Sequence, residues 1–315
     1  MSTLRKIPSI KTTSINNLKK FSVWLNEQNN RLNRLNEVFP PDNQLKLFYR
    51  GVSNSTYPNL PSIYRKNILI QKEDYIIKEC MRYAPHEFSQ ENYTFDELVK
   101  LQHYGLPTRL LDLTTNPYVA LFFAVHPYKQ KLPSIIEVKQ QIEQLNHEQL
   151  RDYVLENFTR YGVRTGKVCA VIVSTKALKF PNSDTISIIS NISKRPSNQF
   201  WTYLERYEKF LKLCLDIPND TRHFDDVCNK VKNKFILDAN TNSEIAYLLH
   251  EIKHEKPYFL NIINIEDMLA IWSVAPNFNN NRIVRQDGAF LIYGISGNKT
   301  TSLRLPSIQV LDELK

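Results

Sequence analysis

The sequence predicts an α+β fold in which helices surround a central mixed or antiparallel sheet. Short apolar, β-branched runs typical of strands lie between longer amphipathic segments typical of helices. The chain has 315 residues, of which 42% are hydrophobic, so it can bury a full core. It contains 16 prolines but only 7 glycines, and no Gly/Ser-rich joint divides it. We therefore expect one large domain with well-defined turns and a helical insertion.

The first half of the chain alternates helices and strands. Pro40-Pro41 ends the first amphipathic segment, while Asn116 as N-cap and Pro117 at the first helical position open the last one. In chain order, we expect a helix at 15–39, a strand at 45–51, helices at 68–81 and 94–102, a strand at 110–113 and a buried helix at 117–125.

The second half contains the clearest strand, the β-branched run at 168–175, which we expect to be central. The other expected elements are a strand at 134–138, helices at 142–157, 200–215, 223–236 and 243–253, and a closing strand after a tight turn at Asp287-Gly288. We therefore expect the chain to have three parts. These are an N-terminal helical segment at 1–40, a main domain at 41–300 with a helical insertion at about 185–270, and a C-terminal tail at 301–315.

The segment 102–117 concentrates polar side chains beside two chain-bending residues. Gly105 tolerates unusual backbone angles and Pro107 restricts Leu106, so a rigid turn should aim Arg109 in one direction. The start of the helix after Asn116 carries free N–H groups that can bind an anion such as phosphate. The candidate ligand-binding or catalytic residues of this segment are Gln102, His103, Tyr104, Arg109, Asp112, Thr114, Thr115 and Asn116.

Two further segments carry candidate residues. Tyr49, Arg50 and Gly51 end the first strand, where the glycine lets a ligand or another backbone come close. Near the C-terminus, 281–294 reads as a loop, a tight turn and a closing strand. It adds Arg282, Arg285 and Gln286 to the candidates.

These three segments resemble the FRG-domain family, named for its (Phe/Tyr)-Arg-Gly motif, here Tyr49-Arg50-Gly51. The long central motif and the late Gln286, Gly288 and Phe290 follow in the family's order, and the resemblance covers roughly residues 15 to 300. The family's associations imply a toxin or antiphage effector.

A more distant likeness is to the ADP-ribosyltransferase fold, and it implies a sheet of that type. In that superfamily a first-strand arginine holds the phosphate or ribose side of NAD, which would be Arg50 here. Thr114 and Thr115 would then shape the nicotinamide pocket. The superfamily's late glutamate is absent, since Gln286 can only hydrogen-bond a ribose hydroxyl and supplies no charge. Relatives that transfer phosphate from RNA ends use arginine and histidine instead.

The resemblance leaves two classes of function open. In the first, an enzyme acts at the ribose of NAD or a related nucleotide, with His103 or Asp112 handling protons and Gln286 orienting the ribose. In the second, a non-catalytic module binds nucleotides, RNA ends or a protein partner. Structural roles are the alternative for each residue: Asp112 pairs with an arginine, His103 lies in the core, and a threonine caps the helix.

Composition limits the remaining classes. The net charge of +9 is compatible with an RNA or phosphate partner, although solvated helix faces explain most of the basic residues. The cysteines form no Cys-x-x-Cys pair, and His250 and His254 have no third ligand nearby, so no metal is expected. The apolar stretch 118–125 is far shorter than the roughly 20 residues of a membrane span. We expect a cytoplasmic protein with no membrane partner, whose NAD-like ligand is a substrate.

Overall fold

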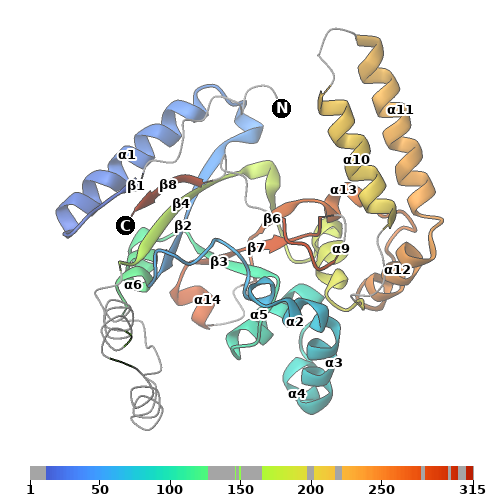
Figure 1. The fold of residues 1–315 in the computed structure, drawn as a ribbon, viewed down its shortest axis with the longest axis horizontal. Coiled ribbons are helices and arrows are strands. Elements are labelled where there is room, and N and C mark those ends of the chain that lie inside the picture. Colours follow the sequence, from blue (N-terminus) through green and yellow to red (C-terminus); the bar gives the residue numbers. More distant parts are fainter. Residues whose placement is uncertain are drawn as a thin grey trace.

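The computed structural model describes residues 12–126, 146, 149, 165–196, 202–216, 222–277, 281–296, 299–303 and 310–314. A single sheet of eight strands runs through this part of the chain in the order β1-β8-β4-β2-β3-β7-β6-β5 (Figure 1). The strands are β1 (Thr12–Thr13), β2 (Leu45–Val52), β3 (Leu110–Thr114), β4 (Lys167–Ser174), β5 (Leu178–Lys179), β6 (Ile271–Val274), β7 (Gly288–Tyr293) and β8 (Val310–Leu314).

The sheet is mixed, as predicted. β1 with β8 and β5 with β6 are parallel pairs, and the other neighbours are antiparallel. The central position of β4 in the order is also confirmed. The expected C-terminal tail needs correction, because β8 pairs with β4 and β1 inside the sheet.

Helices surround the sheet on the described part of the chain. They are α1 (Leu18–Asn36), α2 (Asn67–Gln71), α3 (Glu73–Tyr83), α4 (Pro85–Phe88), α5 (Thr94–His103), α6 (Pro117–Val125), α9 (Asp184–Ile192), α10 (Thr202–Asp216), α11 (Arg222–Ala239), α12 (Ser243–Glu255), α13 (Ile265–Met268) and α14 (Asn281–Arg285). The run from α9 to α13 lies between β5 and β6 in the chain. Figure 1 shows α10 and α11 beyond the β6 end of the sheet, while α1 and α6 lie beside β4 and β8.

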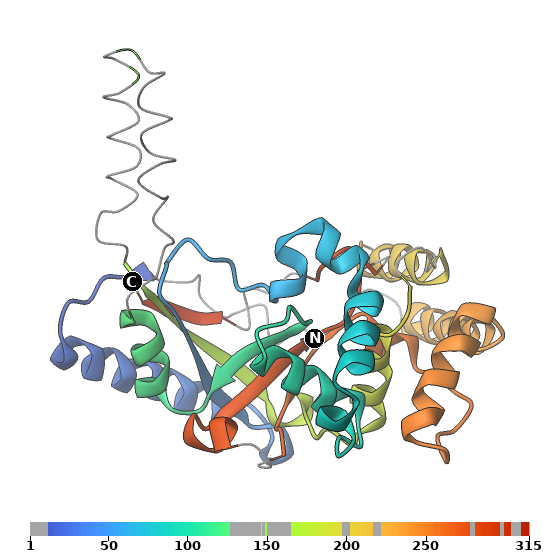
Figure 2. The same cartoon turned by 90° about the horizontal axis from the view of Figure 1, so that it is seen from below.

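One face of the sheet is covered by two separate groups of helices. Near β2 and β4, α1 and α6 bury Phe21, Trp24 and Ala120 against the strands. Near β3, β6 and β7, helices α5, α9 and α14 bury a second cluster that includes Phe95 and Phe290, whose rings meet edge to face. Figure 2 shows α1 and α6 toward one end of the sheet and α5 and α9 toward the other. The strip of sheet between them holds the candidate site.

The opposite face is covered mainly by the loop after β2. Leu60 and Tyr64 from this loop pack on side chains of β2, β3, β4 and β7, among them Phe48 and Leu111. Strand alternation accounts for the division, because neighbouring residues of a strand point to opposite faces. The side chain of Arg50 therefore leaves β2 on the face that the loop covers. The side chain of Tyr49 leaves it on the face that the helices cover.

The pairing of β2 with β3 is unusually short. β2 pairs with β4 through eight residue pairs, from Leu45↔Ser174 to Val52↔Lys167. It pairs with β3 through Tyr49↔Thr114 alone, so the two strands separate beyond this point. Such a separation leaves main-chain groups without ladder partners and opens room between the strands.

Several expected helices and loops differ from the structure in their bounds. The expected helix at 68–81 is broken at Lys72 into α2 and α3, and the loop expected before Asp287 holds the short helix α14. The strand expected at 134–138 and the helix expected at 142–157 lie outside the described residues. No helix in the described ranges has both the length and the apolar composition needed to cross a bilayer.

Candidate functional site

A small cavity lies where β2 and β3 separate, and we call it the Arg50 cavity. Its volume is about 150 Å³. Segments from four parts of the chain meet here: β2, the end of α5, β3 with α6, and the α14–β7 turn. The polar residues that line the cavity are Tyr49, Arg50, His103, Asp112, Thr114 and Gln286. The structure thus brings together residues that were predicted from three distant segments.

Arg50 supplies a positive charge to the cavity. Its side chain is only 9% exposed. Nη1 donates to the main-chain oxygen of Asp112 at 2.9 Å, which bridges the gap between the separated strands. Nε has no hydrogen-bond partner among the described residues. Burial lowers the pKa of Arg50 from its ordinary value, and the nearby Asp112 opposes that shift. A buried N–H donor without a partner is costly unless a ligand or water accepts from it.

Asp112 supplies a carboxylate to the cavity. The residue is exposed, and its Oδ1 accepts a hydrogen bond from Gln102 Nε2 at 2.6 Å. The alternative in which Asp112 pairs with Arg109 is wrong, because Arg109 has a different partner. Arg50 contacts the main-chain oxygen of Asp112, so the carboxylate stays available for chemistry.

Gln286 and Thr114 meet at the edge of the cavity. Thr114 Oγ1 donates to the main-chain oxygen of Gln286 at 2.6 Å and accepts from the N–H of Asn116 at 3.0 Å. The threonine therefore joins β3 to the α14–β7 turn and holds Gln286 at the cavity. His103, on the last turn of α5, lines the same cavity.

The apolar wall of the cavity was not predicted. It is formed by Val119 and Phe123 from α6, Ile283 from α14 and Phe290 from β7. The all-round apolar character of α6 gave no sign of which side faces a ligand. The spacing of Val119 and Phe123 could have indicated this wall, because residues four apart share one side of a helix.

Gly51 allows α6 to approach β2. A Cβ atom at this position would lie 1.7 Å from the main-chain oxygen of Ala120, a distance that no real contact reaches. The sequence left open whether a ligand or a backbone comes close to Gly51. The structure shows the backbone of α6 in that place, and Gly51 also lines the cavity.

Arg109 lies outside the Arg50 cavity, which corrects the prediction that it contacts a ligand. Its side chain is fully buried and donates through Nε to Glu73 at 2.9 Å, and through Nη2 to the same carboxylate. Burial opposes its charge, but the Glu73 carboxylate raises the pKa of Arg109 above the ordinary value. Lys299 contacts Glu73 as well, at 3.2 Å. Arg109 is therefore a structural residue that anchors the start of β3.

The start of α6 is also occupied by the protein itself. The Asn116 side chain accepts from the N–H of Tyr118 at 3.0 Å, which confirms it as the N-cap. Its Nδ2 lies 3.4 Å from the Asp287 carboxylate, and the N–H of Thr115 donates to the Asp287 main-chain oxygen at 3.1 Å. The protein's own groups thus contact Thr115 and Asn116 at the start of the helix, and neither residue lines the Arg50 cavity.

The remaining predicted residues do not line the cavity either. Tyr104 is exposed and donates to Glu87 at 2.5 Å, and Gln102 reaches the site only through Asp112. Arg285 is exposed beyond the cavity, and the side chain of Arg282 is outside the described part. Over that same part, no group of three or more His, Cys, Asp or Glu side chains is arranged to hold a metal ion.

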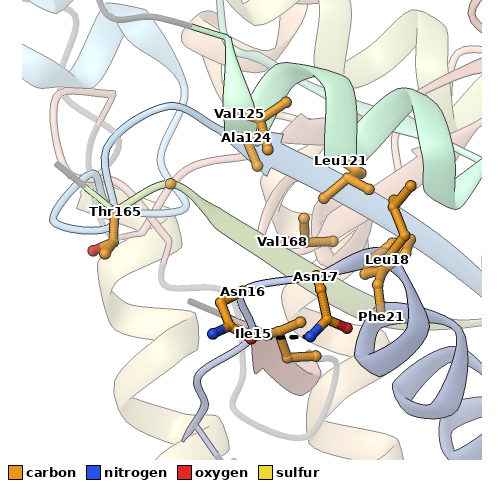
Figure 3. Close-up of a pocket in the computed structure, with 11 residues that line it drawn as sticks. Ile15, Asn16, Asn17, Leu18, Phe21, Leu121, Ala124, Val125, Thr165 and Val168 are labelled. Atoms are coloured by element: carbon orange, nitrogen blue, oxygen red, sulfur yellow. Dashed lines mark hydrogen bonds between the residues drawn. The ribbon is translucent and has the colours of Figure 1, made fainter. Parts of the chain in front are cut away.

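A second, larger cavity of about 380 Å³ lies on the other side of α6 (Figure 3). Leu18, Phe21, Leu121 and Val168 point into it from α1, α6 and β4. The described residues that line it include no titratable side chain, so they offer neither an acid–base group nor a charged side chain. The Arg50 cavity is therefore the better candidate for a functional site.

Comparison with known protein families supports the assignment that was made from the Tyr49-Arg50-Gly51 motif. Residues 45–132 match the family model of the FRG domain. The chain contains an FRG domain. The matched range begins with β2 and includes Arg50, His103 and Asp112, whereas Gln286 lies outside it. No curated protein and no solved structure shows significant similarity to the chain.

Proposed function

We propose that the Arg50 cavity of this FRG domain binds the phosphate-bearing part of NAD or a similar nucleotide, and that the protein acts at the adjacent ribose. The observation that carries this proposal is the buried Arg50 Nε, which lacks a partner among the described residues, beside the exposed Asp112. A phosphate oxygen suits a guanidinium N–H better than a neutral acceptor does, because both groups are charged.

The size of the cavity supports partial enclosure of the ligand. Sites that bury a drug-sized molecule typically have volumes of about 300 to 1,000 Å³. A cavity of about 150 Å³ accommodates a phosphate with part of a sugar or a ring. Phe123 and Phe290 offer an apolar surface for the ring, and the rest of a dinucleotide would lie outside.

Asp112 supplies the charge that Gln286 lacks. When the bond between ribose C1′ and the nicotinamide nitrogen breaks, nicotinamide leaves with the electron pair and the ribose becomes a cation. A carboxylate near that cation stabilises the transition state electrostatically. Water or an acceptor hydroxyl then bonds to C1′, and His103, which lines the same cavity, would accept the proton that is released. Gln286 would hydrogen-bond a ribose hydroxyl.

Titration calorimetry with NAD and with ADP tests the binding step. Arg50→Ala should weaken binding about 10- to 100-fold, the usual value of a hydrogen bond to a charged group. Arg82→Ala is the matched control, because Arg82 is exposed on α3 and pairs with Glu79. Equal affinity of the wild type and Arg50→Ala for both nucleotides would refute the proposal.

Turnover separates the enzyme from a binding module. Release of nicotinamide from NAD, or transfer of ADP-ribose to protein or RNA, should fall by about 100-fold or more in Asp112→Asn while binding persists. The alternative is a non-catalytic module for nucleotides, RNA ends or a protein partner, and the small cavity favours recognition of a terminal group. Tight binding that depends on Arg50, without any turnover by the wild type, would establish this alternative. A toxin or antiphage role for the FRG domain belongs to the enzyme proposal and requires turnover.

A further inference from the structure

Gln102 lies at the end of α5 and contacts Asp112 without lining the cavity. Its Nε2 donates to Asp112 Oδ1 at 2.6 Å. Its Oε1 accepts from the hydroxyl of Thr108. The two ends of the amide thus have different partners, one donor and one acceptor. A side-chain amide with both ends engaged has a single orientation, so an N–H group is held toward the carboxylate.

Thr108 is fixed in turn by the backbone around it. The residue is 1% exposed, and its hydroxyl accepts from the N–H of Leu110 at 3.3 Å. Because that oxygen accepts from Leu110, its own proton points to Gln102. The N–H of Thr108 donates to Ser62 Oγ at 3.3 Å, and its carbonyl oxygen accepts from the N–H of Ile63 at 3.3 Å. The loop after β2 therefore holds the residue that orients Gln102.

We propose that Gln102 is a positioning residue that acts through Asp112, rather than a ligand-binding residue. One oxygen of the Asp112 carboxylate is held by the amide, and the other oxygen has no hydrogen-bond partner among the described residues. The carboxylate therefore keeps one orientation and one oxygen for a ligand. This inference rests on the proposed function, in which Asp112 stabilises charge on the ribose.

A neutral amide suits this role better than the alternatives. A glutamate at position 102 would place two like charges within hydrogen-bond distance and push Asp112 away. A leucine would fill the same space but donate nothing, so Asp112 could rotate. Small displacements of a catalytic group are costly, since a shift of about 1 Å can lower a rate about 100-fold.

Steady-state kinetics of NAD cleavage test the inference. Gln102→Leu should lower kcat about 10- to 100-fold and change KM little, because Arg50 still binds the phosphate. Gln102→Glu should be equally slow at pH 8 and recover as the pH falls, since a protonated glutamate donates an O–H in place of the amide N–H. Gln90→Leu, at an exposed turn before α5, is the control and should behave as wild type. Recovery at low pH is not expected from a merely structural role.

Crystal structures of the wild type and Gln102→Leu test the same inference without any activity. The Asp112 carboxylate should leave its position in the variant, while the backbone of β3 stays in place. An unmoved carboxylate, or unchanged kcat in Gln102→Leu when Asp112→Asn is inactive, overturns the positioning role and leaves the proposed function standing. If Asp112 moves as expected but the wild type neither binds nor cleaves NAD, the proposed function fails and the orienting contact stands.

Discussion

Arg50 donates from Nη1 to the main-chain oxygen of Asp112, 2.9 Å away, across the point at which β2 and β3 separate. One arginine therefore replaces part of a hydrogen-bond ladder and presents its charge to the cavity that the missing ladder leaves. The binding charge and the catalytic carboxylate that we propose are joined through this contact. Their separation is set by the two strands and does not depend on a flexible loop.

Gly51 and Gly105 should respond very differently to alanine. Gly51→Ala requires α6 to move, because its Cβ would lie 1.7 Å from the Ala120 oxygen. We expect severe loss of folding stability or of soluble protein. Gly105 has a φ of 84° but open space around its Cβ position, so Gly105→Ala should cost only about 1 kcal/mol. Urea unfolding of both variants measures this. Equal stability of the two variants would contradict the close contact between α6 and β2.

The buried pair Arg109–Glu73 should be important for stability. Arg109→Met leaves the buried Glu73 carboxylate with Lys299 as its remaining cation. Removing one partner of a buried ion pair costs about 3–5 kcal/mol. Denaturant unfolding measures the loss, and Arg82→Ala, which breaks only the surface pair with Glu79, should cost under about 1 kcal/mol. A change of similar size in both variants would show that Arg109 has no special anchoring role.

Asp96 should make stability depend on pH. Burial, followed by the nearby Glu91 charge, raises the pKa of Asp96 from its ordinary value of 3.8 to about 6. Folding therefore favours the protonated carboxyl, and its contribution to stability declines as the pH rises from about 4 to about 6. Asp96→Asn should be more stable than the wild type at pH 7 by about 1–2 kcal/mol, and this advantage should vanish near pH 4.

A carboxylate with the opposite shift is the control for Asp96. Hydrogen bonding by Arg82 lowers the pKa of Glu79. Its contribution to stability is therefore present at neutral pH and disappears as the pH falls below the unfolded value. Thermal melts of Glu79→Gln should show a small deficit at pH 7 that disappears in acid. Parallel pH profiles for the two variants would contradict the burial of Asp96.

Asn116 should contribute to the stability of α6 through its cap. Asn116→Ala removes the acceptor for the N–H of Tyr118, and loss of such a cap typically costs about 1 kcal/mol. Asn116→Ser keeps an acceptor and should cost less. Thermal unfolding of both variants, with Thr115→Ala as an exposed neighbour for comparison, measures the difference. If Asn116→Ser is as unstable as Asn116→Ala, the cap is not the reason for the effect.

Much of the fold was predictable wherever local signals agree with the tertiary structure. The Asn116-Pro117 start of α6 and the β-branched run of β4 are examples, since caps and strand propensity act over a few residues. Helix α9 was missed because its apolar residues face two cores: Ile186 and Ile189 pack toward α5, and Ile188 and Ile192 toward α12. Its polar residues Ser187, Ser190 and Asn191 are buried as well, so the polar side of the helix does not mark a solvent-exposed face.

The candidate site could be predicted from the sequence only where a residue's role does not depend on a partner far along the chain. Arg50, His103 and Asp112 were identifiable from their motifs, whereas the ion pair of Arg109 depends on Glu73, which no local pattern marks. Thr94 is a similar case. It lies three residues before Glu97, the spacing of a capping box, but Tyr93 is the N-cap of α5 and the Thr94 hydroxyl contacts Glu255, which lies far along the chain.

The two glycine contacts of α6 restrict how the Arg50 cavity can change its width. Gly51 and Gly166 face the main-chain oxygens of Ala120 and Ala124, one helical turn apart. With no side-chain layer between helix and sheet at these points, α6 is held against both β2 and the start of β4. The wall that α6 contributes to the cavity is therefore fixed in position, and amide hydrogen exchange should be slow along this helix.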